Sequence, residues 1–311
     1  MNLPQPTSPG EIRPESSDSK NRIFVFAGLA FFLLLLATTN PASVKAAWEE
    51  FERIIQLKSD PLPASPAKLS GHEIEELSSM SPQQQAELLM ERAINHYDGA
   101  IELIDKQVLG WYGQIDVEKG RLAGLLNTAI NANDLRVRAA SLEITLAGYD
   151  LPKTPESVDQ ILSRLQNEPA HRAWFLWILG VLGNRGVEPP RIETVFLDRL
   201  HDADETVRFY AVTGLGLLAT NESIPSLLGV FREDPSPRVR EGAACSLAQS
   251  GMFTQSQRLR AVPELLKMMD DPTLDAATRG WVFQALRDIT GTSLGSDPAA
   301  WRDWWSHHGQ R

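Results

Sequence analysis

The sequence predicts an all-α protein, in which an α-solenoid of stacked helical hairpins follows one N-terminal transmembrane helix. Three observations predict this fold class. A helical unit recurs every 32–39 residues from about residue 123 onwards. Residues 23–39 form an apolar run without a charged side chain. No segment alternates polar and apolar residues with the period of two that a half-buried strand requires, so a sheet is not expected.

The composition is that of a folded globular protein, with 42% hydrophobic, 23% charged and 7% aromatic residues in a chain of 311. The net charge of -10 comes from 30 basic and 40 acidic side chains. Such an acidic chain repels a polyanion, so nucleic acid is not an expected partner. Cys245 is the single cysteine, which excludes an internal disulfide and a metal site built on several thiolates.

The first 39 residues predict a tail and an anchor. Residues 1–22 are polar and rich in proline and serine, and they are expected to be disordered because they have little apolar surface to bury. Residues 23–39 are seventeen in number, the short end of what crosses a bilayer as a helix. We favour an uncleaved signal anchor. A cleaved signal peptide is one alternative, because Val-Lys-Ala at residues 44–46 has the small side chains of a cleavage site. A buried core helix is another, although the run lacks amphipathic periodicity.

The charges that flank this run set the expected orientation. Arg13, Lys20 and Arg22 precede it, whereas only Lys45 lies within ten residues after it, which favours a cytoplasmic N-terminus. When the window is widened, the numbers of basic residues before and after the apolar run become equal. Residues 1–39 carry no net charge, so the whole -10 lies beyond them and should hold the solenoid away from anionic headgroups. We expect a single-pass protein of the cell membrane with an extracytoplasmic solenoid, periplasmic in a Gram-negative cell.

Residues 40–72 are predicted to hold a juxtamembrane helix and a proline-rich linker. Apolar side chains recur at helical spacing from Trp48 to Ile55, within a short helix over residues 47–58. Its aromatic residues fit the interfacial belt of a membrane or an ordinary helix face equally well. Three prolines follow, and they predict a semi-rigid, exposed spacer.

Residues 73–122 are expected to form helices that pack on the solenoid. Ser81, Pro82 and Gln84 predict a helix start, because they combine a capping box with a proline in the first turn. Apolar residues at spacings of three and four, from Leu89 to Ile104, then predict one helix of roughly two dozen residues.

Residues 123–291 are predicted to be the repeats. In each unit, an Asp-containing turn precedes an arginine, and a leucine follows that arginine by seven residues. The pairs are Arg172/Leu179, Arg208/Leu215, Arg240/Leu247 and Arg279/Leu286. A degraded first copy contributes Arg138 without the leucine. A second amphipathic helix precedes each copy, as in residues 224–231. One hairpin cannot cover its own apolar face, so the units must stack.

The amino-acid sequences of the units resemble those of HEAT repeats. Two units carry the likeness, DETVRFYAVTGLG at residues 204–216 and DPSPRVREGAACSL at residues 234–247. More specifically, they look like the bacterial HEAT-like repeats grouped with phycobilisome lyases. The resemblance is absent from residues 1–72. It implies a solenoid that acts as a scaffold or binding surface. Because some lyase-like members attach or detach bilins, it also implies a tetrapyrrole lyase or isomerase as an alternative.

Two local patterns imitate reactive sites. Gly214, Gly216 and Ala219 match a dinucleotide-binding G-x-G-x-x-A, with Asp234 downstream. The pattern lies within a predicted helix, whereas a cofactor needs it between a strand and a helix. The glycines are therefore expected to allow close helix packing. Cys245 has small neighbours on its helix and is expected to be an inert core thiol.

The histidines do not predict a metal site. They are His72, His96, His171, His201, His307 and His308. None has a second histidine four residues away on one helix. His201 lies near Asp202 and Asp204, where helix capping is expected rather than metal binding. P-loop and paired-carboxylate patterns are missing from the sequence. We therefore predict no catalytic, cofactor-binding or metal-binding residues, no cofactor and no enzymatic activity.

The repeated arginines are expected to be structural. They are Arg138, Arg172, Arg208, Arg240 and Arg279. Each should bond the Asp-bearing turn of its own or the adjacent repeat through its planar guanidinium group. An anion-binding stripe along the stack is the alternative, disfavoured by the acidic surroundings.

Residues 292–311 predict a helix that caps the stack. Asp297 and Pro298 form its start. Trp301, Trp304 and Trp305 fall on one face, where they would cover the last apolar surface of the solenoid. An anchor for a partner is the alternative.

Taken together, these patterns favour a membrane-anchored, non-catalytic scaffold. It would bind a protein partner on the solenoid surface, or serve as a subunit of a membrane-associated complex, with residues 23–39 as its membrane contact. The alternatives are the tetrapyrrole-type lyase or isomerase and a structural spacer with no soluble partner.

Overall fold

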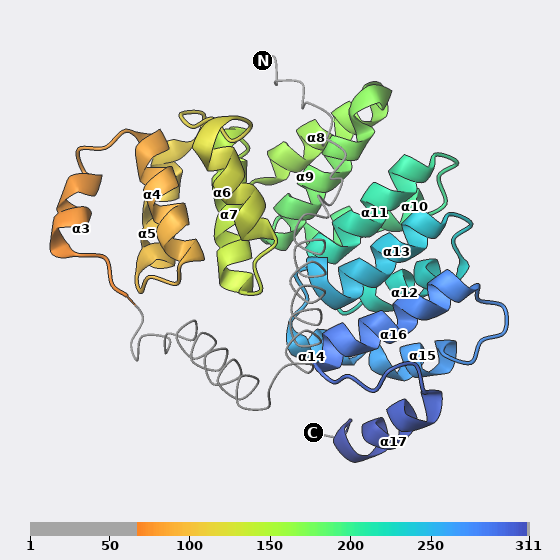
Figure 1. Ribbon diagram of the computed structural model, residues 1–311. Helices are drawn as coiled ribbons and strands as arrows, with labels where there is room; N and C mark the ends of the chain where they lie inside the picture. The colour runs from red at the N-terminus through yellow and green to blue at the C-terminus, as the bar shows by residue number, and fades with distance from the viewer. Residues whose placement is uncertain (1–66, 310–311) are drawn as a thin grey trace, which may run out of the picture. The chain divides into compact units, whose positions relative to one another are not determined.

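The computed structural model describes residues 67–309, and the regular elements in that range are helices (Figure 1). An isolated bridge between Lys68 and Asp98 is the extended pairing in the described range. The expected tail at 1–22, the expected span at 23–39 and the helix at 47–58 lie outside it. Of the helices within residues 67–309, none is long and apolar enough to cross a membrane.

The N-terminal helices form a group of their own. They are α3 (Gly71–Leu77), α4 (Pro82–Ile94), α5 (Ala100–Gln107), the 3-10 turn η1 (Val108–Trp111), α6 (Gly120–Ile130) and α7 (Leu135–Gly148). The boundary expected at residue 123 falls inside α6. These helices share a core that runs from Leu69 to Ala147.

The helix start at Ser81 is confirmed, but the single long helix is wrong. Ser81 accepts from the Gln84 amide and Gln84 caps Ser81 in return, which completes the capping box. The helix stops at Ile94 because His96 and Gly99 adopt left-handed conformations, with φ of 57° and 84°. Glycine takes such a φ without strain, so a turn forms there and α5 folds back against α4. The apolar spacing continued through a turn that the glycine made possible.

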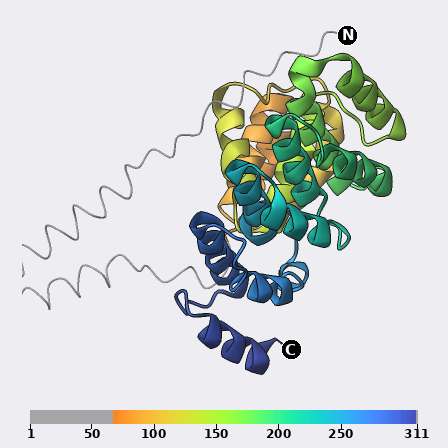
Figure 2. The ribbon, with the colours of Figure 1, turned by 90° about the vertical axis from the view of Figure 1, so that its right-hand side faces the viewer.

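The remaining helices form the stack of hairpins. They are α8 (Pro155–Asn167), the 3-10 turn η2 (Pro169–His171), α9 (Arg172–Asn184), α10 (Pro189–Arg199), α11 (Glu205–Leu218), α12 (Ser223–Glu233), α13 (Pro237–Cys245), the π-helical turn η3 (Ser246–Ser250), α14 (Gln255–Leu259), α15 (Val262–Met268), α16 (Ala276–Thr290) and α17 (Pro298–His308). Figures 1 and 2 show the hairpins α8/α9, α10/α11, α12/α13 and α15/α16 one below the next, with α17 at the end.

The repeat pattern accounts for the core of this stack. The four leucines that follow the repeated arginines by seven residues are all at most 1% exposed. They are Leu179, Leu215, Leu247 and Leu286. Four apolar residues of α12 are buried as well, Ile224, Leu227, Leu228 and Phe231. The predicted pairing of helices and the predicted seam are thus confirmed.

Helix α7 belongs to both cores. Leu142 and Leu146 pack with the repeats, whereas Val137 and Ile144 pack with the N-terminal helices. A helix covered on two sides needs apolar residues around its circumference rather than on one stripe. This explains why the first copy of the repeat is degraded in sequence.

The glycines of the G-x-G-x-x-A pattern serve helix packing, as expected. A Cβ built on Gly180 of α9 would lie 3.0 Å from the Cα of Gly214 on α11, so the two backbones nearly touch. A Cβ on Gly214 would also clash with the ring of Phe196, and one on Gly216 would meet Ser246. The pattern permits this close contact between hairpins.

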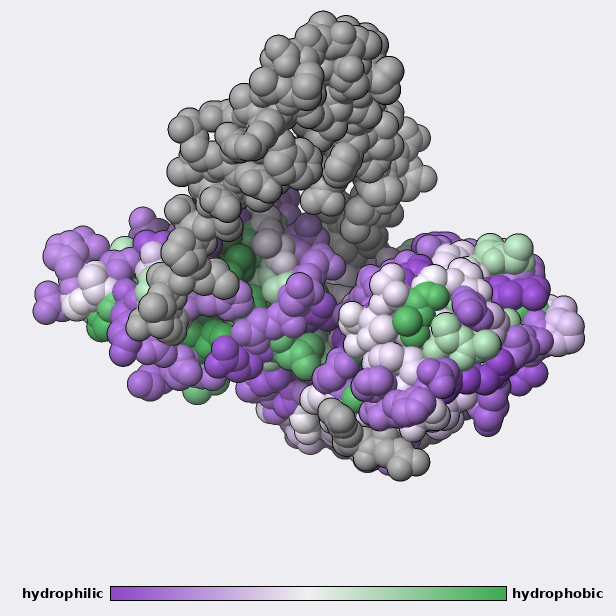
Figure 3. All heavy atoms as spheres, turned by 60° about the horizontal axis from the view of Figure 1, so that its bottom comes forward, coloured by the Kyte–Doolittle hydropathy of each residue, from purple (hydrophilic) through white to green (hydrophobic). Residues whose placement is uncertain are grey.

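The tryptophan helix closes the stack mainly through Trp301, and Trp305 packs partly buried against the same core. Asp297 caps α17 by accepting from the Ala299 amide at 2.9 Å. Trp301 is fully buried and its Nε1 donates to the carbonyl of Gly295 at 3.1 Å. Trp304 and Trp305 remain half-buried. Figure 3 brings the α17 end of the stack toward the viewer, and apolar residues lie there in small groups among hydrophilic ones.

The close contact at Gly214 gives a testable prediction. Gly214→Ala should lower the free energy of unfolding by about 1–3 kcal/mol, because the added methyl group overpacks the contact with Phe196. Gly229→Ala is the matched control: Gly229 is an exposed position of α12, where a Cβ meets no atom within 4 Å, and the change should stabilise the protein by about 0.4–1 kcal/mol. Urea unfolding of both variants measures the difference. Equal effects at the two positions would contradict the packing argument.

Candidate functional site

The repeated arginines share one geometry. Four of the inner helices begin at a capping side chain, and an arginine follows each cap by four residues. Helical side chains lean toward the N-terminus of their helix, so each guanidinium group reaches back to a carbonyl of the preceding turn. The donor and acceptor residues are Arg138 and Ala132, Arg208 and Asp202, Arg240 and Asp234, and Arg279 and Leu274.

Two of these arginines also bind the next repeat. Arg208 donates to both carboxylate oxygens of Asp234, at 2.8 and 3.2 Å, and Arg240 donates to Asp275 at 2.6 Å. The expectation that arginines bond the Asp-bearing turns is confirmed for this pair. Arg172 departs from the pattern, because its helix starts directly from η2 and its Nε is buried without an acceptor among residues 67–309.

The Arg208–Asp234 pair gives a second prediction. Asp234→Ala should destabilise the protein by about 3–5 kcal/mol, because it leaves the nearly buried guanidinium group of Arg208 without its carboxylate. Asp159→Ala removes one of the two carboxylate partners of Arg191, in a pair where both side chains are exposed, and should cost less than about 1 kcal/mol. Chemical denaturation measures both changes. A loss at Asp234 no larger than that at Asp159 would show that the buried pair is not a structural tie.

Arg138 joins two parts of the chain that are far apart in sequence. Its Nη1 donates to the carbonyls of Gln249, Ser250 and Gly251, at 2.8 to 3.1 Å. These carbonyls end the π-helical turn η3, three hairpins further along the stack. They have no partners within their own helix, so an arginine that reaches them satisfies the helix end.

A second arginine converges on the same turn. Arg258 donates to the carbonyls of Leu247, Gln249 and Gly251, at 2.6 to 3.0 Å, and to Phe253 at 3.1 Å. Arg138 is 5% exposed and Arg258 is 8% exposed. Every acceptor that the two guanidinium groups reach among the described residues is a backbone carbonyl.

The two arginines line an open cleft of about 670 Å³. Its other walls include Asn131, Asn133, Gln249, Ser250, Gln255 and Asp288. Asp288 is held by the side-chain amides of Gln249 and Gln284, at 2.6 and 2.7 Å. The cleft therefore combines two buried positive charges with one carboxylate that is engaged elsewhere. We call it the arginine cleft.

Burial sets the electrostatics of the cleft. Loss of solvation lowers the pKa of Arg138. It lowers the pKa of Arg258 to about 10, and the nearby positive charge of Arg138 adds to the effect. Both side chains are still protonated at neutral pH, so the cleft holds two like charges close together.

The repeat pattern pointed to Arg138 but not to Arg258. Arg258 lies in the short helix α14, between η3 and the next hairpin, outside the repeated sequence pattern. The capping box of Thr254 and Gln257 marks the start of that helix in the sequence. It gives no sign that the arginine folds back onto the preceding turn.

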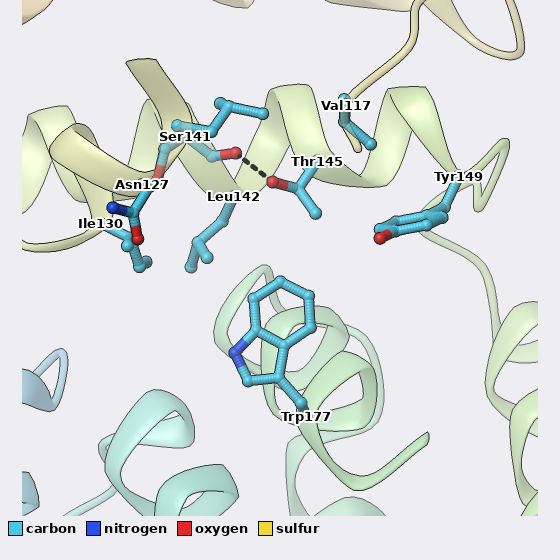
Figure 4. A pocket seen from close by; sticks show the side chains of 9 residues that line it. Val117, Asn127, Ile130, Ser141, Leu142, Thr145, Tyr149 and Trp177 are labelled. Carbon is cyan, nitrogen blue, oxygen red and sulfur yellow. Dashed lines mark hydrogen bonds between the residues drawn. The ribbon is translucent and has the colours of Figure 1, made fainter. Parts of the chain in front are cut away.

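A smaller cavity of about 200 Å³ lies beside α7 (Figure 4). Trp177 of α9 faces Leu142 and Thr145 of α7 across it. Thr145 follows Arg138 by seven residues, where the other copies have leucine. Its hydroxyl donates to the Ser141 carbonyl at 2.8 Å. The missing leucine thus coincides with a cavity, walled mainly by apolar side chains.

Helix α7 also carries a buried carboxylate. Glu143 is 3% exposed, and its Oε1 accepts from Lys153 Nζ at 3.0 Å and from Arg185 Nε at 2.7 Å. Its Oε2 is buried without a partner among the described residues. These bonds tie α7 to the loop before α8 and to the end of α9.

The single cysteine does not lie in the core position that the sequence predicts. Cys245 is exposed, so the expected core position is wrong. Its neighbours Ala243 and Ala244 take the buried face instead. Partial burial, with the negative charges of Glu241 and Asp288, raises the pKa of the thiol.

His201 is exposed, and residues 67–309 contain no group of three or more His, Cys, Asp or Glu placed to hold a metal ion.

Comparison with known families finds a match within the stack of hairpins. Residues 193–287 match the family described as HEAT repeats. This segment is therefore similar to HEAT repeats. It covers most of the three hairpins from α10 to α16, in which the arginine–leucine pattern is strongest. No curated protein matches the chain. The finer likeness to phycobilisome-lyase repeats stays a prediction.

Two grooves flank helix α12 within the segment that matches HEAT repeats. The α10–α12 groove has a volume of about 580 Å³ and is lined by Leu197, Leu200, His201, Val230 and Pro235, among others. The α12–α15 groove has a volume of about 480 Å³ and includes Ile224, Leu228, Arg232, Arg260 and Met268. Each groove thus combines apolar and charged side chains, and Gly229 lies between them without a side chain to separate them.

Proposed function

We propose that the protein is a membrane-anchored helical-repeat scaffold, without catalytic activity of its own, that binds a protein partner or serves as a subunit of a membrane-associated complex. The observation that carries the proposal is the stack of hairpins at residues 193–287, which matches HEAT repeats, because such arrays are stacked surfaces rather than reaction centres. Both α12 grooves fall within the matched segment.

The α12 grooves are the surface where we place the partner. Mixed apolar and charged linings are typical of protein interfaces, in which an apolar centre is surrounded by a polar rim. Arg232 and Glu233 supply charge beside Leu228 in the α12–α15 groove. A helix or loop of the partner that presents apolar residues between charged ones would fit this pattern.

Site-specific crosslinking tests this surface. A photo-crosslinking amino acid at Ser226, which lines the α10–α12 groove, should capture a protein of one defined mass in intact cells. The control is the same amino acid at exposed Gln166 on α8, where no such product is expected. Mass spectrometry identifies the captured protein. Identical products at the two positions, or none at Ser226, would contradict partner binding at α12.

The membrane anchor is a separate part of the proposal. Its support is the uncharged run at residues 23–39, with basic residues before it. This arrangement favours an N-terminus in the cytoplasm and repeats outside it, in the periplasm of a Gram-negative cell.

Alkaline extraction tests the anchor. The full chain should stay in the membrane pellet after carbonate treatment, because a spanning helix is held by burial in lipid rather than by charge. A variant without residues 23–39 should be released. Protease added outside spheroplasts should then digest the repeats of the full chain. Release of the full chain by carbonate would rule out the anchor, and protection of the repeats would reverse the orientation.

A further inference from the structure

The arginine cleft holds charge that the fold itself does not neutralise. Buried charged side chains are normally paired with an opposite charge. Arg208 and Arg240 follow this rule, because each has an aspartate on the next repeat. Arg138 and Arg258 have backbone carbonyls instead. Two buried like charges repel each other, and a negative ligand would relieve that repulsion.

One side of the cleft has donors that are free to bind such a ligand. Arg138 Nη2 has no hydrogen-bond acceptor among residues 67–309. It is also not one of the polar atoms in that range that are fully buried from solvent without a partner. Asn133 and Ser250 also line the cleft, and neither side chain makes a hydrogen bond to another described residue. Arg258, by contrast, uses all three of its nitrogens on carbonyls and contributes mainly charge.

We propose that the arginine cleft binds a phosphate group, free or carried by a small molecule. A planar carboxylate is recognised best by two parallel N–H groups on one edge of a guanidinium. That arrangement is not open here, because Nη1 and Nε of Arg138 are committed to carbonyls. The free donors instead come from three separate residues. A tetrahedral ion with several acceptor oxygens can reach donors that lie in different directions. The cleft volume of about 670 Å³ leaves room for an attached organic group.

The acidic character of the chain does not oppose this site. At about 0.1 M salt, charges further away than about 10 Å are largely screened, so the nearest side chains decide the local potential. Among the lining residues these are two arginines and one aspartate. The α12 grooves are lined by other residues, so phosphate binding and partner binding are independent proposals.

Isothermal titration calorimetry of the full chain in detergent tests the proposal, at constant ionic strength. Inorganic phosphate should bind saturably at one site. Glycerol 3-phosphate is the second titrant: equal or tighter binding indicates a phosphorylated small molecule, and weaker binding indicates the free ion. Succinate should bind far more weakly. Absence of saturable phosphate binding, or equal binding of succinate, would overturn the proposal.

Variants tie the binding to these residues. Arg138→Gln should weaken phosphate binding about tenfold or more, the equivalent of one lost charge-assisted hydrogen bond. Because this change also loosens η3, the double variant Asn133→Ala/Ser250→Ala serves as a second test; both residues are exposed and it should weaken binding while leaving the fold intact. Arg238→Gln, at an exposed arginine outside the cleft, should bind phosphate as the unchanged protein does. If both the double variant and Arg138→Gln bind phosphate with unchanged affinity, the proposal is wrong and the two arginines serve only to bind the carbonyls at the end of η3.

Discussion

Each hairpin of this protein has more apolar surface than its two helices can cover, and the neighbouring hairpins must cover the remainder. Helix α11 shows the requirement most clearly, since most of its length from Val207 to Leu218 is buried between α9, α10 and α13. The backbones of α9 and α11 can approach each other only where side chains are absent, as at Gly180 and Gly214. The order of the stack follows from this need, and so does the closing tryptophan, because the last hairpin has no further neighbour.

Close stacking creates a second requirement at the turns. When hairpins approach each other, the carbonyls that precede each inner helix lose contact with water, and a buried carbonyl without a donor is costly. An arginine four residues into the helix solves this locally, because its side chain leans back over the turn. Where the next repeat offers an aspartate, as Asp234 does for Arg208, the same side chain also joins two hairpins. At Arg138 the neighbour offers only carbonyls, and charge accumulates in a cleft.

The sequence predicted what is local and repeated. The caps, the arginines beside the turns and the buried leucines follow from spacing alone. The break at Gly99 was missed because apolar spacing continued across it, and only the left-handed backbone shows that the chain turns. Cys245 was placed in the core because small neighbours do not reveal which face of a helix is buried. Arg258 was missed for a different reason: it lies outside the repeat, and its bonds reach back to the turn just before its own helix, which the repeat pattern does not mark.

The link from Arg138 to Gly251 spans 113 residues and bypasses the hairpins in between. An open solenoid tolerates gain or loss of a unit, since each unit touches only its neighbours. Here an inserted or deleted hairpin between α7 and η3 would carry the acceptor carbonyls out of reach of the arginine. The bridge therefore fixes how many units this segment can contain, and further units can be added only outside the stretch between α7 and η3.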